Sequence, residues 1–230
     1  MTKPFFRSCW LGRLAYRQAL ELQEALAAAR AHGTVPDTLL LLEHPETYTL
    51  GRRGKEENLL APREALERLG VEIHRVDRGG DITFHGPGQL VGYPILALEN
   101  RAREVKLYVA NLEETLILAL ASFGVSAQRL PSHPGVWVGD EKIASIGVRI
   151  DARAVTRHGF ALNVNTDLTF FRWIVPCGIV GKSVTSLSRV LGRTLPLPEV
   201  ADLVADCFGK VFRMERVRLD SASEALVPSS

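Results

Sequence analysis

A cysteine in a tight turn is the residue of this chain best suited to nucleophilic chemistry. Cys177 lies between Pro176 and Gly178, directly after the apolar sequence WIV. Proline restricts the backbone there, and glycine leaves room for a substrate carbonyl beside the thiol. Because thiolates attack carbonyl carbons to form covalent intermediates, the motif is compatible with acyl transfer. From the tripeptide alone, a buried structural cysteine is the commoner outcome.

Lys142 is the candidate base that would make such a thiol reactive. Residues 142–150 are predicted to be extended, and alternation places Lys142 on a face whose other members are apolar. The ammonium could reach solvent at the end of the strand, which is the commoner outcome. If it lies instead in a partly dry pocket, desolvation lowers its pKa and it can accept the thiol proton. His85 and His158 are the alternative bases, although a lone histidine in a loop more often forms structural hydrogen bonds.

A glycine-rich stretch, RGGDITFHGPGQLVGYPI at residues 78–95, has the character of a ligand-binding loop. Its glycines permit close backbone approach, and Pro87 stiffens the chain between them. The stretch lacks the GKS or GKT ending of a phosphate loop and the GxGxxG order of a dinucleotide fold. The six histidines show no HxxxH or HExxH spacing, so we expect neither a metal nor another cofactor.

The composition limits the class of protein. With 46% hydrophobic residues in 230, the chain can bury a substantial core, and we expect one catalytic domain over residues 1–230. A net charge of +2 gives no general case for a nucleic-acid binder. No secretory signal and no apolar run of about 18 residues is present, so we expect a cytoplasmic protein without a membrane span. The three cysteines are widely spaced and are expected to be thiols.

Helices and antiparallel hairpins are the elements expected to position these residues. Such a mixture predicts an α+β fold with a mainly antiparallel sheet and packed helices. Residues 44–58 are expected to form a loop, and residues from about 216 to 230 a flexible tail. A hairpin is expected from residue 136 to 150, with its turn at Gly139 and Asp140. Helices are expected at residues 12–30, 62–69, 103–123, 185–191 and 198–212, and further strands at 38–43, 71–76, 90–98 and 160–164.

Three stretches together resemble the lipoyl(octanoyl) transferase family. They are RGGDITFHGPGQLVGYPI, KIASIGVRI at residues 142–150 and HGFALNVNTDLTFFRWIVPCG at 158–178, and EHPETYTLGRR at 43–53 resembles the first block of that family. The resemblance implies a fold related to the catalytic domains of biotin and lipoate protein ligases. It also implies an acyltransferase that moves an octanoyl group from octanoyl-acyl carrier protein to a lysine of lipoyl domains, in 2-oxoacid dehydrogenase complexes and the glycine cleavage H protein.

The resemblance also implies roles for individual residues. Cys177 matches the acyl-accepting cysteine of the family, and Lys142 matches the lysine that lowers its pKa. The positions that match the substrate pocket are Arg78, Gly79, Gly80, Asp81, Ile82, Thr83, Phe84, His85, Ser145, Ile146, Gly147, Gly159, Phe160 and Ala161.

Three alternatives remain open at this stage. An ATP-dependent lipoate or biotin protein ligase of the same fold would activate a free acid and would not need a nucleophilic cysteine. A non-catalytic module could bind an acyl carrier and only shelter its lipid. A cysteine hydrolase would release free octanoate instead of octanoyl-lysine.

Overall fold

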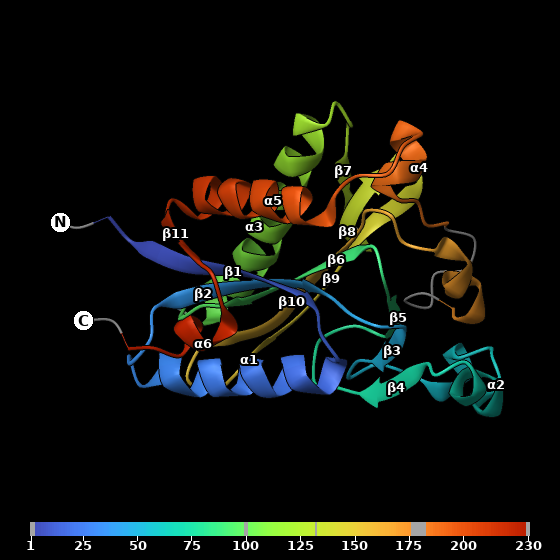
Figure 1. Cartoon of the computed structure of the whole chain (residues 1–230), viewed down its shortest axis with the longest axis horizontal. Coiled ribbons are helices and arrows are strands. Elements are labelled where there is room, and N and C mark those ends of the chain that lie inside the picture. The colour runs from blue at the N-terminus through green and yellow to red at the C-terminus, as the bar shows by residue number, and fades with distance from the viewer. Residues whose placement is uncertain (1–2, 99–100, 132, 176–182, 229–230) are drawn as a thin grey trace.

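The computed structural model describes residues 3–98, 101–131, 133–175 and 183–228. An eight-stranded sheet has helices on both faces, and a three-stranded sheet lies beside it (Figure 1). The strands are β1 (Phe5–Arg13), β2 (Asp37–Glu43), β3 (Thr47–Leu50), β4 (Glu72–Arg75), β5 (Ile82–His85), β6 (Gln89–Ile95), β7 (Gln128–Leu130), β8 (His133–Val138), β9 (Glu141–Ile150), β10 (Thr156–Asn163) and β11 (Glu215–Leu219). The α-helices are α1 (Tyr16–Ala31), α2 (Arg63–Arg68), α3 (Arg101–Ser122), α4 (Leu187–Leu191), α5 (Leu197–Phe212) and α6 (Ala222–Ala225), and Glu56–Asn58 and Leu168–Trp173 are 3₁₀ helices.

The large sheet is mainly antiparallel. Its strand order is β11-β1-β2-β6-β10-β9-β8-β7, and only β1 pairs in parallel, with β11 on one side and β2 on the other. The other neighbours in that order are antiparallel. Strands and helices are therefore mixed around one antiparallel sheet, and the predicted α+β class is confirmed.

The sheet is the middle of three layers. Helices α3 and α5 cover one face and α1 covers the other (Figure 1). The leucines of β2 alternate between the two cores: Leu39 and Leu41 pack under α3 and α5, whereas Leu40 and Leu42 pack against α1. A strand covered on both faces has no polar side, which explains its continuous apolar run. Within the described ranges, no helix combines the length and apolar character needed to cross a membrane.

The predicted hairpin is confirmed as β8 and β9, and the predicted helices correspond to α1 to α5 within a few residues. The expectation of a loop over residues 44–58 was wrong at Thr47–Leu50. These four residues are fully buried and form β3, which pairs with β4 in parallel and with β5 in antiparallel orientation. A run of four residues between Pro45 and Gly51 is too short to show a periodicity, so its burial was not visible in the sequence.

The expected flexible tail from residue 216 does not agree with the structure. Strand β11 pairs with β1, and Ala225 of α6 is buried in the core on the α1 side of the sheet. The Arg7 guanidinium donates to the carbonyl of Val227 at 2.5 Å. Strand β1, which no pattern indicated, links β11 to β2. Strand β11 is an edge strand with charged side chains, which are common at edges and hide the strand pattern. Its partner β1 lies about 210 residues earlier in the chain, so local patterns revealed neither β1 nor β11.

The buried side chain of His44, directly after β2, connects three segments of the core. The Nδ1 atom of His44 lies 2.7 Å from the Leu14 carbonyl, and its Nε2 atom lies 2.7 Å from the Tyr93 hydroxyl. A carbonyl only accepts, so Nδ1 carries the proton of the neutral ring and Nε2 accepts from Tyr93. Burial lowers the pKa of His44 from 6.5 to about 4. The ring is therefore neutral in the folded protein at pH 7.

This burial makes stability fall as the solution is acidified. The unfolded chain takes up a proton below its own pKa of 6.5 and the folded chain does not, so the contribution is complete above pH 6.5 and is lost toward the folded pKa of about 4. We expect His44 to account for a loss of about 2 kcal/mol in the free energy of unfolding between pH 7 and pH 5.

Denaturant titrations at the two pH values measure this loss. His44→Gln should make the free energy of unfolding less dependent on pH by about that amount. Equal pH dependence in the wild type and in His44→Gln would contradict the assignment.

Candidate functional site

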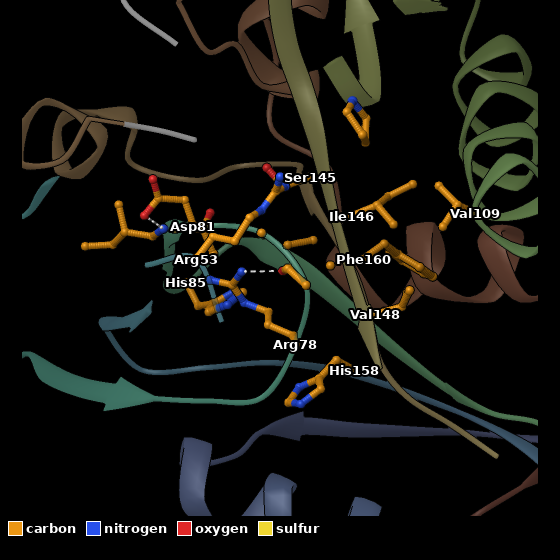
Figure 2. Close-up of a pocket in the computed structure, with 18 of the residues that line it drawn as sticks. Arg53, Arg78, Asp81, His85, Val109, Ser145, Ile146, Val148, His158 and Phe160 are labelled. Atoms are coloured by element: carbon orange, nitrogen blue, oxygen red, sulfur yellow. Dashed lines mark hydrogen bonds between the residues drawn. The ribbon is translucent and has the colours of Figure 1, made fainter. Parts of the chain in front are cut away.

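A cavity of about 620 Å³ opens where β9 and β10 meet the segment 78–83 and the beginning of α3. One side of it carries Arg53, Arg78, Asp81, His85 and Ser145 (Figure 2). The opposite side is an apolar wall, defined by Val105, Val109, Ile146, Val148 and Phe160. Figure 2 shows four of these wall residues facing the polar group across the open space. A cavity of this size, mostly apolar with a few polar groups at one side, fits a small ligand or an acyl chain.

The structure brings most of the sequence-predicted pocket residues to this one cavity. The predicted residues that line it are Lys142, Arg78, Gly79, Gly80, Asp81, Ile82, Thr83, His85, Ser145, Ile146, Gly147, Gly159, Phe160 and Ala161. Phe84 lies elsewhere, because β5 alternates and turns this ring into the small core beside the cavity. It stacks on Phe170 at 4.6 Å between ring centroids and is 1% exposed. Cys177 lies outside the described residues.

Arg78 is a buried cation at the polar side of the cavity. Its Nη2 donates to the carbonyl of Thr49 at 2.7 Å and to the Thr49 hydroxyl at 2.9 Å, and its Nη1 donates to the Gly79 carbonyl at 3.0 Å. These bonds hold the guanidinium between the small sheet and the loop. Only 8% of Arg78 is exposed, so its charge acts in a setting where electrostatic forces are weakly screened.

Glycine allows β9 to pack directly against the Arg78 loop. A Cβ at Gly147 would lie 2.9 Å from the Gly79 carbonyl oxygen and 3.1 Å from Cδ of Arg78. The Gly79 N–H donates to the Val148 carbonyl at 2.9 Å across the same contact. On the neighbouring strand, a Cβ at Gly159 would lie 2.1 Å from the Gly92 carbonyl oxygen. Gly147 and Gly159 are thus positions where two backbones meet.

Lys142 lies in the cavity and does not extend to solvent. Its residue is 8% exposed, and its Nζ atom is 5.2 Å from the centroid of the Trp137 ring. Ile146 and Val148, further along β9, line the same cavity. The pairing of β9 with β8 shifts by one residue between Lys142 and Ala144, so the regular alternation predicted over residues 142–150 is interrupted there. The side chain is therefore buried at the cavity and not at the solvent-exposed end of the strand, while the role of Lys142 as a base stays a prediction.

The main chain of Lys142 is bonded to the residues that follow the segment containing Cys177. The Lys142 N–H donates to the Ser183 carbonyl at 2.9 Å, and the Thr185 N–H donates to the Lys142 carbonyl at 3.0 Å. On the other side of that segment, the Val175 N–H donates to the Asn58 carbonyl at 2.8 Å. Val175 and Ser183, on the two sides of that segment, are thus both held by backbone hydrogen bonds.

His158 is the third residue of β10 and lines the cavity, with a left-handed backbone, φ +57°. Its N–H donates to Oε1 of Gln23 at 2.8 Å, and its Nε2 lies 2.7 Å from a carboxylate oxygen of Asp77. The bond from His158 is the main reason that the pKa of Asp77 is lowered to about 2. Burial lowers the pKa of His158 despite that carboxylate. The neutral imidazole therefore donates to Asp77 and holds the start of the Arg78 loop against β10.

His85 and Asp81 have structural partners of their own. The two ring nitrogens of His85 lie 2.9 Å from Oε1 of Gln89 and 3.3 Å from the Thr49 hydroxyl, and burial lowers the pKa of His85 well below its usual value. The Asp81 carboxylate accepts from the Asn58 amide at 2.6 Å. Both residues line the cavity, and both also fix the loops around it.

Sequence reasoning missed several residues of the cavity. Val148 lies on the face that alternation had already marked, and the helical spacing of Val105 and Val109 could have indicated a shared surface. Tyr93 lies in the glycine-rich stretch 78–95 but was not singled out, and Tyr16 gave no signal, because only the tertiary fold brings α1 to the site.

The two described cysteines are poor nucleophiles. Cys9 and Cys207 are free thiols, and both are buried. Burial raises the pKa of Cys9 to about 11 and also raises the pKa of Cys207. Such thiols are not ionised at neutral pH. If a cysteine of this chain acts as a nucleophile, these two are therefore unsuited to that role.

Comparison with known proteins links this geometry to a family. The family model of the lipoyl protein ligase A/B catalytic domain matches residues 15–209. The octanoyltransferase of Solibacter usitatus is 53% identical over 205 residues, which cover 89% of this chain and 92% of that protein.

Solved structures agree on the fold. A lipoate-protein ligase A bound with ATP has a TM-score of 0.74 and covers 98% of this chain and 92% of its own, at 15% identity. The biotin protein ligase of Aquifex aeolicus has a TM-score of 0.51 and covers 91% of this chain and 70% of its own, at 14% identity. The predicted relation to these ligases in fold is confirmed. With the family model and the high identity to curated relatives, the chain belongs to the lipoyl protein ligase A/B catalytic-domain family, as one of its octanoyltransferases.

Proposed function

We propose that Cys177 accepts an octanoyl group from octanoyl-acyl carrier protein and passes it, with Lys142 as the base, to a lysine of a lipoyl domain. The observation that carries this proposal is the position of Lys142: its side chain is buried in the cavity, and its backbone is bonded to Ser183, six residues after Cys177. The other two cysteines are poor nucleophiles, which leaves Cys177 as the candidate.

The first half-reaction exchanges one thioester for another. Lys142 takes the proton of the Cys177 thiol, and the thiolate attacks the carbonyl carbon of the donor thioester. As the tetrahedral intermediate collapses, the bond to the carrier sulfur breaks, and Lys142 returns the proton to that sulfur. The exchange is close to isoenergetic because a thioester is both consumed and formed. It therefore requires no ATP.

The second half-reaction forms the amide. The neutral amine of the acceptor lysine attacks the Cys177 thioester, the C–S bond breaks, and Lys142 takes the proton that the nitrogen loses. Backbone N–H groups can stabilise the oxyanion in both steps. The N–H of Gly79 donates to Val148 and that of Gly88 donates to Glu43, so these two turn positions are already engaged.

The two sides of the cavity suit different parts of the ligand. The apolar wall fits the alkyl chain, and the polar side near Arg78 fits the end of the ligand that carries the carbonyl. The proposed acceptors are the lipoyl domains of 2-oxoacid dehydrogenase complexes and the glycine cleavage H protein, and the proposed location is the cytoplasm. A solved structure with the same fold belongs to an archaeal lipoylation system, described as a bi-partite lipoate protein ligase and its E2 lipoyl domain from Thermoplasma acidophilum, which supports an acceptor of this kind.

The covalent intermediate provides the test. When the protein is mixed with octanoyl-acyl carrier protein and no acceptor, peptide mass spectrometry should find an octanoyl thioester on Cys177. Cys177→Ala should abolish both the adduct and transfer to a lipoyl domain, while Cys9→Ala and Cys207→Ala, as matched controls, should keep both.

Other outcomes identify the alternatives. An adduct on Cys9 or Cys207 would overturn the assignment. Turnover of free octanoate only with ATP would indicate a ligase, release of free octanoate would indicate a hydrolase, and full activity of Cys177→Ala would contradict covalent catalysis.

The apolar wall predicts a length preference that one substitution should change. Val109→Phe adds bulk to the wall, so the ratio of kcat/KM for octanoyl over butanoyl donors should fall by about tenfold. Leu107→Phe, at an exposed position of the same helix, is the matched control and should keep the ratio. An unchanged ratio in Val109→Phe would show that the chain does not bind against this wall.

A further inference from the structure

Trp137 lies against the amine of Lys142. The two residues face each other across the β8–β9 hairpin as register partners, so their side chains leave the sheet on the same face. The Lys142 Nζ atom is 5.2 Å from the centroid of the Trp137 ring. This distance falls within the range in which an indole face attracts a cation. The contact is buried, since Trp137 is 1% and Lys142 is 8% exposed.

The indole ring is held in this orientation by its own polar atom. Trp137 Nε1 donates to the His133 carbonyl at 3.1 Å, and the His133 ring meets the indole edge to face with 6.0 Å between centroids. The ring therefore cannot turn away from Lys142 without losing this partly buried hydrogen bond.

Gly135 also contacts the Lys142 side chain and leaves room for it. Its φ of +121° suits only glycine, and a Cβ there would lie 2.6 Å from Cε and 3.4 Å from Nζ of Lys142. The Gly135 N–H donates to Oε1 of the buried Glu113 at 2.9 Å. Helix α3 therefore fixes the backbone that the lysine side chain packs against.

We infer that Trp137 is a positioning residue that orients the Lys142 amine toward the cavity and stabilises its protonated form. A buried lysine loses the solvation of its charge, which favours the neutral amine. The face of the indole replaces part of that solvation, and it interacts with the ammonium only. The inference rests on the proposed pairing of Lys142 with Cys177, in which the protonated lysine stabilises the thiolate.

The direction of the effect follows from this pairing. Without the indole face, the state with protonated Lys142 and ionised Cys177 is less favourable, so ionisation of the thiol requires a higher pH. Buried cation–π contacts of about 1–2 kcal/mol correspond to a shift of about one pH unit in the midpoint of thiol ionisation. A role in packing alone would lower stability and leave this midpoint in place.

The experiment measures the rate at which iodoacetamide alkylates Cys177 between pH 6 and pH 10, resolved by peptide mass spectrometry. Trp137→Leu should raise the pH midpoint by about one unit. Trp137→Phe, which keeps an aromatic face, should raise it by less than Trp137→Leu does. Trp10→Leu is the matched control for the loss of a tryptophan beside the large core and should keep the wild-type midpoint.

Lys142→Ala separates this inference from the proposed function. If Lys142→Ala raises the midpoint and Trp137→Leu does not, the pairing stands and the role of Trp137 is overturned. If neither variant raises it, the pairing of Lys142 with Cys177 itself fails. If Trp137→Leu does not fold, Trp137→Phe decides, because an unchanged midpoint in that variant would also overturn the inference.

Discussion

The contact between β9 and the Arg78 loop is the constraint on which the cavity depends. Gly147 has no side chain, so the carbonyl of Gly79 can approach its Cα, and the Gly79 N–H reaches the Val148 carbonyl one residue further along. The loop is thereby joined to the large sheet, while Arg78 joins it to Thr49 of the small sheet. Since the cavity lies between these two sheets, a side chain at position 147 would force apart the walls that enclose it.

The side chain of Lys142 is buried within this rigid framework. Burial of an ammonium is unfavourable unless other groups replace the lost solvation, and it favours the neutral amine when they do not. The amine of Lys142 lies over the face of Trp137, and the main chain of Lys142 forms hydrogen bonds with Ser183 and Thr185. These surroundings suit the proton-shuttle role proposed for Lys142, because a shuttle must accept and release a proton within each cycle.

Local patterns in the sequence predicted only part of the candidate site. The β9 pattern and the turn at Gly139 placed Lys142 at the start of a strand but left open whether its amine enters a pocket or solvent. The segments that line the cavity were indicated by the family resemblance. Phe84 was misplaced because family positions do not show which face of a four-residue strand points inward. Five strands, β1, β3, β5, β7 and β11, were missed for a related reason, since their partners lie far along the chain or their runs are short.

Fold alone does not separate this protein from the ATP-dependent ligases that share it. A lipoate-protein ligase A has the same architecture at 15% identity, so the layers and the cavity are compatible with either chemistry. What differs is how the acyl group is activated. A ligase must make an activated acid from ATP, whereas a donor thioester is activated already and needs only a thiol to receive it. A buried lysine whose backbone is tied to the segment after Cys177 is suited to the second task. The chemistry thus depends on a few side chains placed on a fold that is common to both.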